Sequence, residues 1–463
     1  MRIIDHMDKS KQRTIIAVVI ITAFITTFTG SALNLSIPDI GEEFGVNAGL
    51  VGWLVTGYTL AVAAFSVPLG RLADITCRKT VLVTGIVIFV ACCIAAVFSM
   101  SMIMLLAVRI VQGIGAAMIF STNTAVLISA FPEEMRGRVL GYSLASTYVG
   151  LSAGPVIGGF LNYNLGWKSI FILTGALGAI AFFAALLKLP REKAELRGKR
   201  FDLAGNLMYV AFIVLLMYGL SEIGTGIAAA ASAVMGAALG VLFVRHEAKA
   251  QEPAVDVIMF KENSGYAFSN ISAMLNYGAT FAVSYLISIY LQVVMGYSSQ
   301  TAGLIMISQP IIMAALSPVT GRFSDKLSPF KMSSMGMAFC AAGTCIFIFI
   351  GQNTPLAVII AALIVTGFGF SLFSSPNTNA VMSCVQKEDY GVASSILATM
   401  RSIGNTLSMV IVTVIVTGFI ADIPLAEAPV HVLVKVIRIS FSVFTGICTV
   451  GIFISLKGSK RRS

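Results

Sequence analysis

Charged side chains are scarce: Asp, Glu, Lys and Arg make up only 11 % of the 463 residues, against 57 % that are hydrophobic. Long polar stretches are also missing, since apolar runs recur from near the start of the chain almost to its end. One soluble core could not bury so many apolar runs. The composition therefore excludes a soluble globular protein and predicts a polytopic membrane protein.

The residue patterns that mark other classes of protein are also absent. Five of the seven cysteines fall inside apolar runs, which excludes a disulfide framework. The three histidines lack the spacing of metal ligands, so we expect no metal site. No G-x-x-x-x-G-K-S/T loop is present to bind nucleotide phosphates, which argues against an ATP-driven pump. A membrane enzyme or sensor remains an alternative, although the chain shows no nucleophile arrangement and no loop longer than about 20 residues.

Fourteen apolar segments are each long enough to cross a bilayer as a helix, which takes roughly 20 residues. The first eight lie near Thr14–Ser36, Ala48–Gly70, Val81–Met100, Met102–Ala130, Val139–Leu161, Trp167–Leu189, Asp202–Ser221 and Gly226–Arg245. The other six lie near Ser264–Met295, Thr301–Arg322, Pro329–Ile350, Pro355–Ser375, Gly391–Ala421 and Val430–Leu456.

Basic residues collect at alternate ends of these segments. One set of ends carries most of the Lys and Arg side chains, and the opposite set carries Asp39, Glu42, Glu43, Glu222, Asp422 and Glu427. Short basic loops stay in the cytoplasm. We therefore expect both termini in the cytoplasm, an uncleaved N-terminal anchor and a place in the plasma (inner) membrane. The net charge of +10 then reflects topology and a bilayer partner, and does not indicate binding to nucleic acid.

An internal repeat divides the chain. "GRLAD" at Gly70 recurs as "GRFSD" at Gly321, 251 residues later, and Asn123 and Gly137 match Asn377 and Gly391, each 254 residues later. Because duplicated halves are common in transporters, the repeat predicts a six plus two plus six order of spans. The expected divisions are an N-terminal six-helix bundle (1–189), a linker with an inserted helix pair (190–263) and a C-terminal six-helix bundle (264–463).

The repeated motif predicts a gating loop. A carboxylate among basic residues, as in "GRLADITCRKT", can form a charge-assisted latch, and glycine allows a tight turn at the helix end. The alternative is a capped turn with topogenic charges, but the second copy favours a symmetric gate. The expected gating residues are Gly70, Arg71, Asp74, Arg78, Lys79, Gly321, Arg322 and Asp325.

The fifth apolar segment contains "GLSAGPVIGG", from Gly150 to Gly159. Small residues four apart, Gly150, Gly154 and Gly158, allow helices to approach closely, and Pro155 removes a backbone hydrogen bond and favours a kink. Together with Gly159, these four residues predict a hinge, with ordinary helix packing as the alternative.

These motifs together resemble the major facilitator superfamily. "GRLADITCRKT" is similar to its loop signature, although Ile75 and Cys77 stand where an arginine and a glycine are usual. "RIVQGIGAAM" resembles its fourth-span signature, and "GLSAGPVIGG" resembles the fifth-span signature of its antiporters. "LNLSIPDI", from Leu33, resembles the end of span one in the fourteen-span drug/proton antiporter branch. The resemblance implies an all-α membrane fold of two six-helix bundles with two additional helices between them.

Arg109 lies about seven residues into the fourth apolar segment, where a permanent charge is costly and usually functional. In the family that it resembles, the matching arginine is implicated in proton coupling, with a structural hydrogen-bond hub as the alternative. Arg401, about ten residues into the thirteenth segment, is a second case. The alternative to a coupling or cavity role is that its side chain extends to the cytoplasmic membrane surface, known as snorkelling. We therefore expect Arg109, Gln112, Asn34 and Arg401 to serve proton coupling or to line a cavity.

No Asp or Glu lies near the middle of any apolar segment, so the sequence does not identify a proton carrier. The branch that the chain resembles commonly has a carboxylate where Thr29 stands here. A cavity with arginine and without a carboxylate favours anionic or neutral amphiphiles over lipophilic cations.

A substrate cavity of this kind should be apolar with a few polar groups. The further polar residues that could line it are Tyr58, Asn123, Tyr148, Asn276, Tyr277, Gln309, Asn377 and Asn379. Interhelical hydrogen bonding is the alternative role for each of them.

The sequence and the resemblance together predict a monomeric secondary transporter without a cofactor. It would export small amphiphilic or drug-like compounds by proton antiport, with the proton gradient as its energy source and alternating access between the bundles. Export of an endogenous lipid or metabolite, or nutrient symport, stays as the alternative within transport, because one scaffold supports all of these.

Overall fold

The computed structural model describes residues 9–33, 36–46, 48–189, 201–222, 226–250, 253, 255, 257–297, 299–386, 389–420 and 429–460. Within these ranges the regular structure is helical and no strand is present. The all-α class expected from the sequence is therefore confirmed.

Thirteen helices of the described ranges are long and apolar enough to cross a membrane, and a bent pair is a fourteenth if it counts as one span. Those of the N-terminal part and the inserted pair are α1 (Lys9–Leu33), α3 (Ala48–Ile75), α4 (Arg78–Val97), α5 (Met102–Ala130), α8 (Lys168–Lys188), α9 (Leu203–Ser221) and α10 (Ile227–Glu247). The bent pair joins α6 (Glu133–Ala153) through the π-helix η2 (Gly154–Gly158) to α7 (Gly159–Leu165).

The C-terminal part has two spans that are interrupted and four that are continuous. The first interrupted span is α12 (Ser264–Thr280), α13 (Val283–Ile289) and the π-helix η3 (Tyr290–Val294), and the second is α14 (Ser299–Met306) and α15 (Ser308–Ser324). The continuous spans are α16 (Pro329–Ile348), α17 (Leu356–Met382), α18 (Tyr390–Ile420) and α19 (Val430–Lys460). Two short helices, α2 (Ile37–Phe44) and α11 (Val257–Glu262), were not expected.

Polar side chains mark where several of these apolar helices begin. The side chains of Ser101, Asp202 and Asn263 each accept a hydrogen bond from a backbone N–H in the first turn, at α5, α9 and α12. Such caps satisfy donors that have no partner within the helix. The boundaries therefore follow local chemistry as well as hydropathy.

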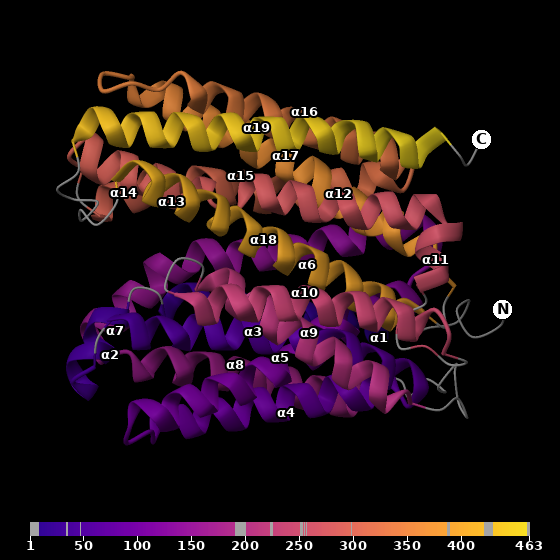
Figure 1. Cartoon of the computed structure of the whole chain (residues 1–463). Helices are drawn as coiled ribbons and strands as arrows, with labels where there is room; N and C mark the ends of the chain where they lie inside the picture. The colour runs from indigo at the N-terminus through magenta and orange to yellow at the C-terminus, as the bar shows by residue number, and fades with distance from the viewer. Residues whose placement is uncertain are drawn as a thin grey trace.

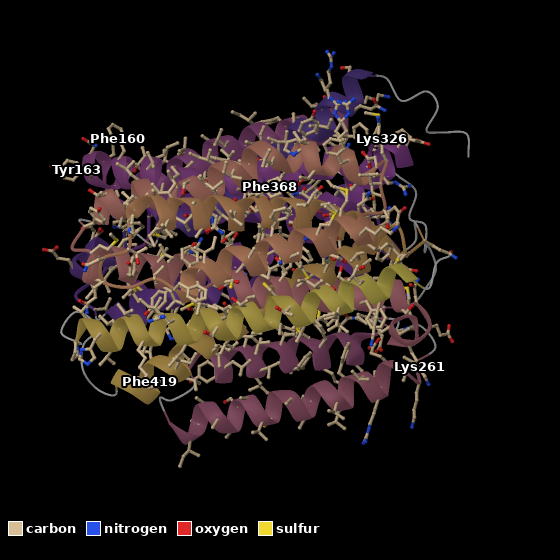
Figure 2. The ribbon with its side chains drawn as sticks, turned by 90° about the horizontal axis from the view of Figure 1, so that it is seen from above. Phe160, Tyr163, Lys261, Lys326, Phe368 and Phe419 are labelled. Carbon is tan, nitrogen blue, oxygen red and sulfur yellow. The ribbon has the colours of Figure 1, made fainter. Side chains whose placement is uncertain are left out.

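The two ends of the molecule differ in charge. Figure 2 shows Lys261 and Lys326 at one end and Phe160, Tyr163 and Phe419 at the other. The start of α1 and the end of α19 lie at the same end as each other, on the right of Figure 1. We call the end with Arg78, Lys261 and Lys326 the basic end, and the opposite end the far end.

Figure 1 shows the helices α1 to α8 gathered below and α12 to α19 above. Of the inserted pair, α9 contacts both groups: the rings of Tyr218 and Trp53 (α3) are 5.7 Å apart, and the Tyr209 hydroxyl lies 2.6 Å from that of Thr399 (α18). The helix α9 is therefore packed on both six-helix bundles, and α10 packs on α9.

Candidate functional site

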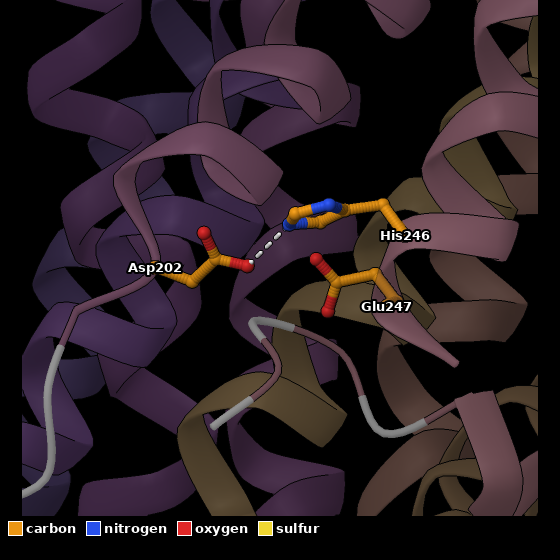
Figure 3. Close-up of side chains that lie close together, drawn as sticks. All are labelled: Asp202, His246 and Glu247. Carbon is orange, nitrogen blue, oxygen red and sulfur yellow. Dashed lines mark hydrogen bonds and ion pairs between the residues drawn. The ribbon is translucent and has the colours of Figure 1, made fainter. Parts of the chain in front are cut away.

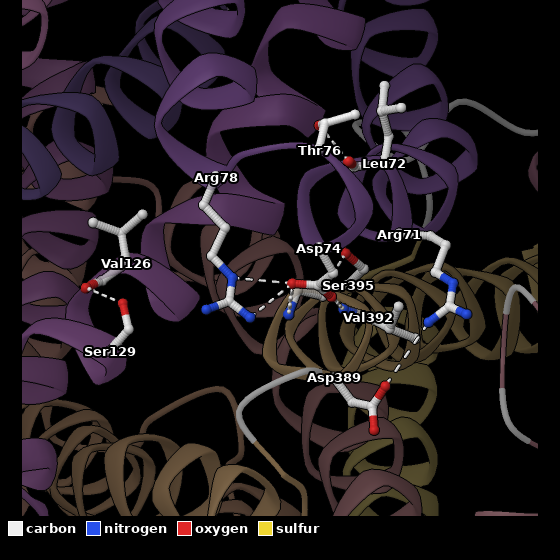
Figure 4. Close-up of polar contacts among 11 residues, drawn as sticks. Arg71, Leu72, Asp74, Thr76, Arg78, Val126, Ser129, Asp389, Val392 and Ser395 are labelled. Atoms are coloured by element: carbon white, nitrogen blue, oxygen red, sulfur yellow. Dashed lines mark hydrogen bonds and ion pairs between the residues drawn. The ribbon is translucent and has the colours of Figure 1, made fainter. Parts of the chain in front are cut away.

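Asp74, at the basic end of α3, reaches across to the second bundle. Its carboxylate accepts hydrogen bonds from the backbone N–H groups of Gly391 (3.2 Å) and Val392 (3.0 Å), in the first turn of α18. It also accepts from Nε (3.0 Å) and Nη2 (2.8 Å) of Arg78 (Figure 4). Helix N-termini favour negative charge, so Asp74 latches the first bundle to the start of α18.

Asp325, directly after α15, makes the reciprocal contact. Its two carboxylate oxygens accept from the backbone N–H groups of Gly137 (2.5 Å) and Arg138 (3.0 Å) in α6. Burial raises the pKa of Asp325 above its ordinary value, and nearby Glu134 adds to this effect, whereas the two backbone hydrogen bonds oppose it. The two halves of the repeat are therefore latched crosswise, with each half supplying one carboxylate and one helix.

Glycine allows the helices to approach this closely. A Cβ on Gly70 would lie 2.7 Å from the carbonyl oxygen of Gly391, and a Cβ on Gly321 would overlap the carbonyl of Gly137. The backbones are therefore in direct contact on both sides of the basic end.

The other expected gating residues are placed differently. Arg71 lies 3.8 Å from the carboxylate of Asp389 (Figure 4), across the seam between the bundles. Lys79 remains within the first bundle, where Nζ donates to the carbonyl of Leu186 at 3.0 Å. The Asp74–Arg78 pair matches the expected carboxylate among basic residues. The backbone partners in the opposite bundle were missed, because a repeat shows which residues are equivalent and not which are in contact.

Arg109 is fully buried inside the first bundle. Its Nε donates to the carbonyl of Leu54 (3.1 Å), its Nη1 donates to Oε1 of Gln112 (2.6 Å), and its guanidinium lies 4.2 Å from the ring centroid of Tyr58. Gln112 in turn donates to Sγ of Cys93 at 3.1 Å. Arg109 and Gln112 thus tie α5 to α3 and α4.

No carboxylate of the described residues contacts Arg109. Thr29, where the related branch has an acid, is buried and donates to the carbonyl of Ile25 in its own helix at 2.6 Å. Asn34 lies outside the described residues. Of the expected group, Arg109 and Gln112 are therefore brought together, whereas Arg401 lies on α18 in the second bundle.

Arg401 belongs to a cluster between the bundles. Its guanidinium lies 5.3 Å from the ring centroid of Tyr277, and Nη2 donates to Oγ1 of Thr378 at 2.6 Å. The ring of Phe370 packs edge-on against Tyr277 (5.0 Å) and against Tyr148 (5.9 Å). Tyr148 comes from α6 in the first bundle, and the others come from α12, α17 and α18 in the second. We call these five residues the aromatic–arginine cluster.

Two buried N–H groups on α17 and α18, the helices that carry Thr378 and Arg401, have unused hydrogen-bonding capacity. Nε of Arg401 and Nδ2 of Asn377 are buried and have no hydrogen-bond partner among the described residues. Buried donors are normally paired, so these two groups could bind a polar atom of a ligand. The hydroxyl of Tyr277 lies 3.3 Å from that of Ser374.

Phe370, Ser374 and Thr378 were not found by sequence reasoning. Phe370 is one of 30 phenylalanines, and nothing in its neighbourhood in the sequence distinguishes it. The three residues stand four apart on α17, which places them on one helix face. That spacing would have been a signal only once Tyr277 and Arg401 were known to lie opposite.

Several other expected cavity residues pair with neighbouring helices. Asn123 donates to Oγ1 of Thr22 at 3.1 Å inside the first bundle, and Asn379 donates to Oγ of Ser324 at 3.2 Å near the basic end. Asn276 and Gln309 are buried on α12 and α15. For Asn123 and Asn379 the geometry matches the alternative of interhelical hydrogen bonding.

The glycines of the fifth span press α6 and η2 onto α1. A Cβ on Gly150 would lie 2.8 Å from the carbonyl oxygen of Phe24, one on Gly154 would lie 2.5 Å from Cβ of Ser31, and one on Gly158 would meet Ala32 at a similar distance. Pro155 lies within the π-helix, and Gly159 begins α7, at a bend of 41°. The bend therefore coincides with the predicted hinge residues.

One cluster of titratable groups was not expected. Asp202, His246 and Glu247, from the inserted pair, place a possible ligand atom each within 4.8 Å of one another (Figure 3). Asp202 lies 3.0 Å from Nε2 of His246 and also accepts from the N–H of Gly205, and Glu247 accepts from the N–H of Val255. Two carboxylates and an imidazole could hold a divalent cation. Here they already form hydrogen bonds that join the start of α9 to the end of α10. Asp202 and His246 are 44 residues apart, so no sequence spacing indicated the cluster.

Comparisons with known proteins agree with this architecture. The family model described as Major Facilitator Superfamily matches residues 19–409 and 269–459. The riboflavin transporter RibZ of Clostridioides difficile is 30 % identical over 86 % of this chain and 87 % of its own length. The multidrug resistance protein Stp of Mycobacterium tuberculosis is 29 % identical over 84 % of this chain and 73 % of its own. The human organic anion transporter MFSD10 (TETRAN) has the same fold, with a TM-score of 0.70, 14 % identity and coverage of 96 % of this chain and 99 % of that chain.

Proposed function

Since this chain belongs to the Major Facilitator Superfamily and is a multi-pass membrane transporter, we propose that it exports small amphiphilic aromatic compounds by proton antiport. In this proposal the basic end faces the cytoplasm of a plasma membrane, because short basic loops are retained there. The protein acts as a monomer without a cofactor, and the proton gradient supplies the energy.

The observation that carries the proposal is the aromatic–arginine cluster. It contains residues of both bundles, as a site with alternating access requires. Its three aromatic rings can pack against a planar compound, and Arg401 can bind an anionic group or a hydrogen-bond acceptor. Arg401 contacts Thr378 and Tyr277 and forms no ion pair with a carboxylate of the described residues, so the cluster favours neutral or anionic compounds over cations. The names of two relatives, a multidrug resistance protein and a drug efflux pump, support export.

The crosswise latches support the transport cycle. Both hold the bundles together at the basic end, so this conformation is closed there. In the opposite conformation Asp74 and Asp325 lose these partners and meet water. They are therefore our candidates for the titratable sites that the middle of the spans lacks. A proton moving inward releases about 2.3 kcal/mol per 100 mV.

Transport of a flavin-like nutrient is the second candidate. It is supported by the 30 % identity to a riboflavin transporter and by the planar aromatic surfaces of Tyr148, Tyr277 and Phe370. Export and nutrient uptake predict opposite directions of net movement, so the direction of flux distinguishes them.

Substrate-driven proton movement in proteoliposomes that contain a pH-sensitive dye tests the proposal. The wild type, Arg401→Ala and the control Arg438→Ala, which removes an exposed arginine of α19, are compared with cationic, neutral and anionic aromatic compounds. We expect the wild type and the control to couple neutral or anionic compounds to proton flux, and Arg401→Ala to lose most flux for the anionic ones. Transport without proton movement would overturn antiport. Equal flux in all three proteins would remove the cluster as the binding site.

A further inference from the structure

A hollow of about 370 Å³ lies at the basic end, where α6 of the first bundle meets α15 of the second. Its polar rim consists of Arg138 and Tyr142 from α6, of Arg322 from the last turn of α15 and of Lys326, which follows that helix. Arg138 lies along the ring of Tyr142, with Nε 3.0 Å from the phenolic oxygen. Three cations from two different bundles therefore surround one space.

None of these three cations forms an ion pair with a carboxylate in the part of the chain that the structure describes. The nearby Asp325 uses its two oxygens for the N–H groups of Gly137 and Arg138. Glu134 is the other acid that acts on Asp325. The hollow thus has three cationic side chains, none of them paired with a carboxylate of the described residues.

The floor of the hollow is apolar and continues along α15. Pro318, Val319 and Phe323 line it. Val319 (47 % exposed) and Phe323 (52 %) align with Ile311 (52 %), eight residues before Val319, on one exposed face of the helix. An exposed apolar strip that ends at three cations matches an amphiphile with an anionic head and a hydrocarbon chain.

We propose that this hollow binds an anionic phospholipid of the inner leaflet. Its phosphate lies among Arg138, Arg322 and Lys326, and one acyl chain follows Val319 and Phe323 along α15. A free anion would use only the cations, whereas a phospholipid uses both the cations and the apolar strip beside them, so the lipid is the better match.

The bound lipid also stabilises the latched conformation. Arg138 donates its backbone N–H to Asp325 and directs its guanidinium to the hollow. A headgroup that binds Arg138 and Arg322 together therefore joins α6 to α15 beside this latch. When the basic end opens, α6 and α15 separate and the hollow loses half of its rim. The placement in the inner leaflet rests on the proposed function, but binding itself does not.

Lipid retention in native mass spectrometry tests binding. The protein is purified from vesicles of phosphatidylcholine with about one fifth phosphatidylglycerol. The variant Arg322→Gln/Lys326→Gln is compared with Arg245→Gln/Lys261→Gln, which removes two exposed cations of the same end outside the hollow. We expect the wild type and the control to retain phosphatidylglycerol, and the hollow variant to retain at least about tenfold less. Equal retention by all three proteins would overturn the site. If inorganic phosphate without lipid stabilises the latched conformation as much as phosphatidylglycerol does, the occupant would be a free anion.

Access to Ser375, whose hydroxyl donates to the carbonyl of Gly137 behind the latch, tests the conformational effect. In a background without native cysteines, Ser375→Cys reacts with a water-soluble maleimide when the basic end opens. We expect phosphatidylglycerol to slow this reaction several-fold, and to have no effect in the hollow variant. An unchanged rate despite retained lipid would overturn the stabilisation. Neither measurement depends on substrate, so failure of the lipid site and failure of the proposed export are distinguishable.

Discussion

The carboxylate of Asp74 accepts the backbone N–H of Gly391, although 317 residues separate the two. Asp325 and Gly137, 188 residues apart, repeat the contact with the bundles exchanged. Both contacts run from a carboxylate to a helix backbone. They need glycine as well as the carboxylates, because a Cβ on Gly391 would collide with the carboxylate of Asp74 and a Cβ on Gly137 would overlap the carbonyl of Gly321.

Asp74→Asn should open the basic end. The change removes the charge beside the start of α18 and the ion pair with Arg78. Charged hydrogen bonds contribute about 1.5–3 kcal/mol, so the equilibrium should shift by roughly 10- to 100-fold. Maleimide labelling of Ser375→Cys measures this shift. Asp389→Asn is the control, since its pair with Arg71 is long and partly exposed, and unchanged labelling in Asp74→Asn would refute the latch.

Gly154→Ala should destabilise the fold. The new Cβ would lie 2.5 Å from Cβ of Ser31 and would push the fifth span away from α1. Overpacking of this kind costs about 1–3 kcal/mol. The control is Gly446→Ala in α19, where the new Cβ has nothing within 4 Å and alanine favours the helix. Thermal unfolding in detergent should therefore show a lower Tm for the first variant and an equal or higher Tm for the second.

Arg109→Ala and Arg401→Ala should have different effects. Removal of Arg109 leaves Oε1 of Gln112 without its donor, at a cost of about 1–3 kcal/mol, and removes a second donor from the carbonyl of Leu54 inside α3. Arg401 is half-buried and faces the seam, so its removal should reduce flux with little change in Tm. Tm and proteoliposome flux are measured on both variants. A normal Tm with abolished proton movement in Arg109→Ala would assign Arg109 to coupling and not to structure.

Glu43 should give the far end a pH-dependent contribution to stability. The N–H of Trp167 donates to its carboxylate at 2.5 Å, with Lys168 at 3.0 Å, and these contacts lower the pKa of Glu43 below about 4.5. A lowered pKa means that the contribution is present above pH 4.5 and is lost as the pH falls through the lowered value. It should be small, because the side chains of Glu43 and Lys168 are about 40 % exposed.

The comparison of Tm between wild type and Glu43→Gln across pH measures this contribution. The wild type should be more stable near neutral pH, and the difference should vanish in acid. A difference that grows as the pH falls would contradict the assignment.

Much of the fold could be predicted from the sequence. Apolar length located the spans, and in Met102–Ala130 the expected and observed bounds coincide. Glycine spacing and Pro155 indicated where the fifth span bends. These features depend on neighbours along the chain. The breaks after Thr280 and Met306 were not predicted. The second had a signal in the sequence, because Pro310 has no N–H to donate to the carbonyl of Met306, four residues earlier.

The candidate site could be predicted only in part. Tyr148, Tyr277 and Arg401 stood out as polar or charged residues in apolar segments, and the structure brings them together. Arg109 stood out for the same reason but lies in a different place, because hydropathy cannot show whether a charge faces a cavity or the carbonyl of Leu54. The partners of Asp74 could not be predicted, because every residue except proline has a backbone N–H group and the sequence does not show which of these groups a side chain contacts.

The crosswise latches have one more consequence. Because each bundle supplies both a carboxylate and a helix that receives one, the contact is self-complementary, as in an isologous dimer related by a two-fold axis. Two identical six-helix units could form both latches without any asymmetric element. The seam of this single chain thus has the geometry of a homodimer interface, although its two sides are bundles of one chain with the inserted pair between them in sequence.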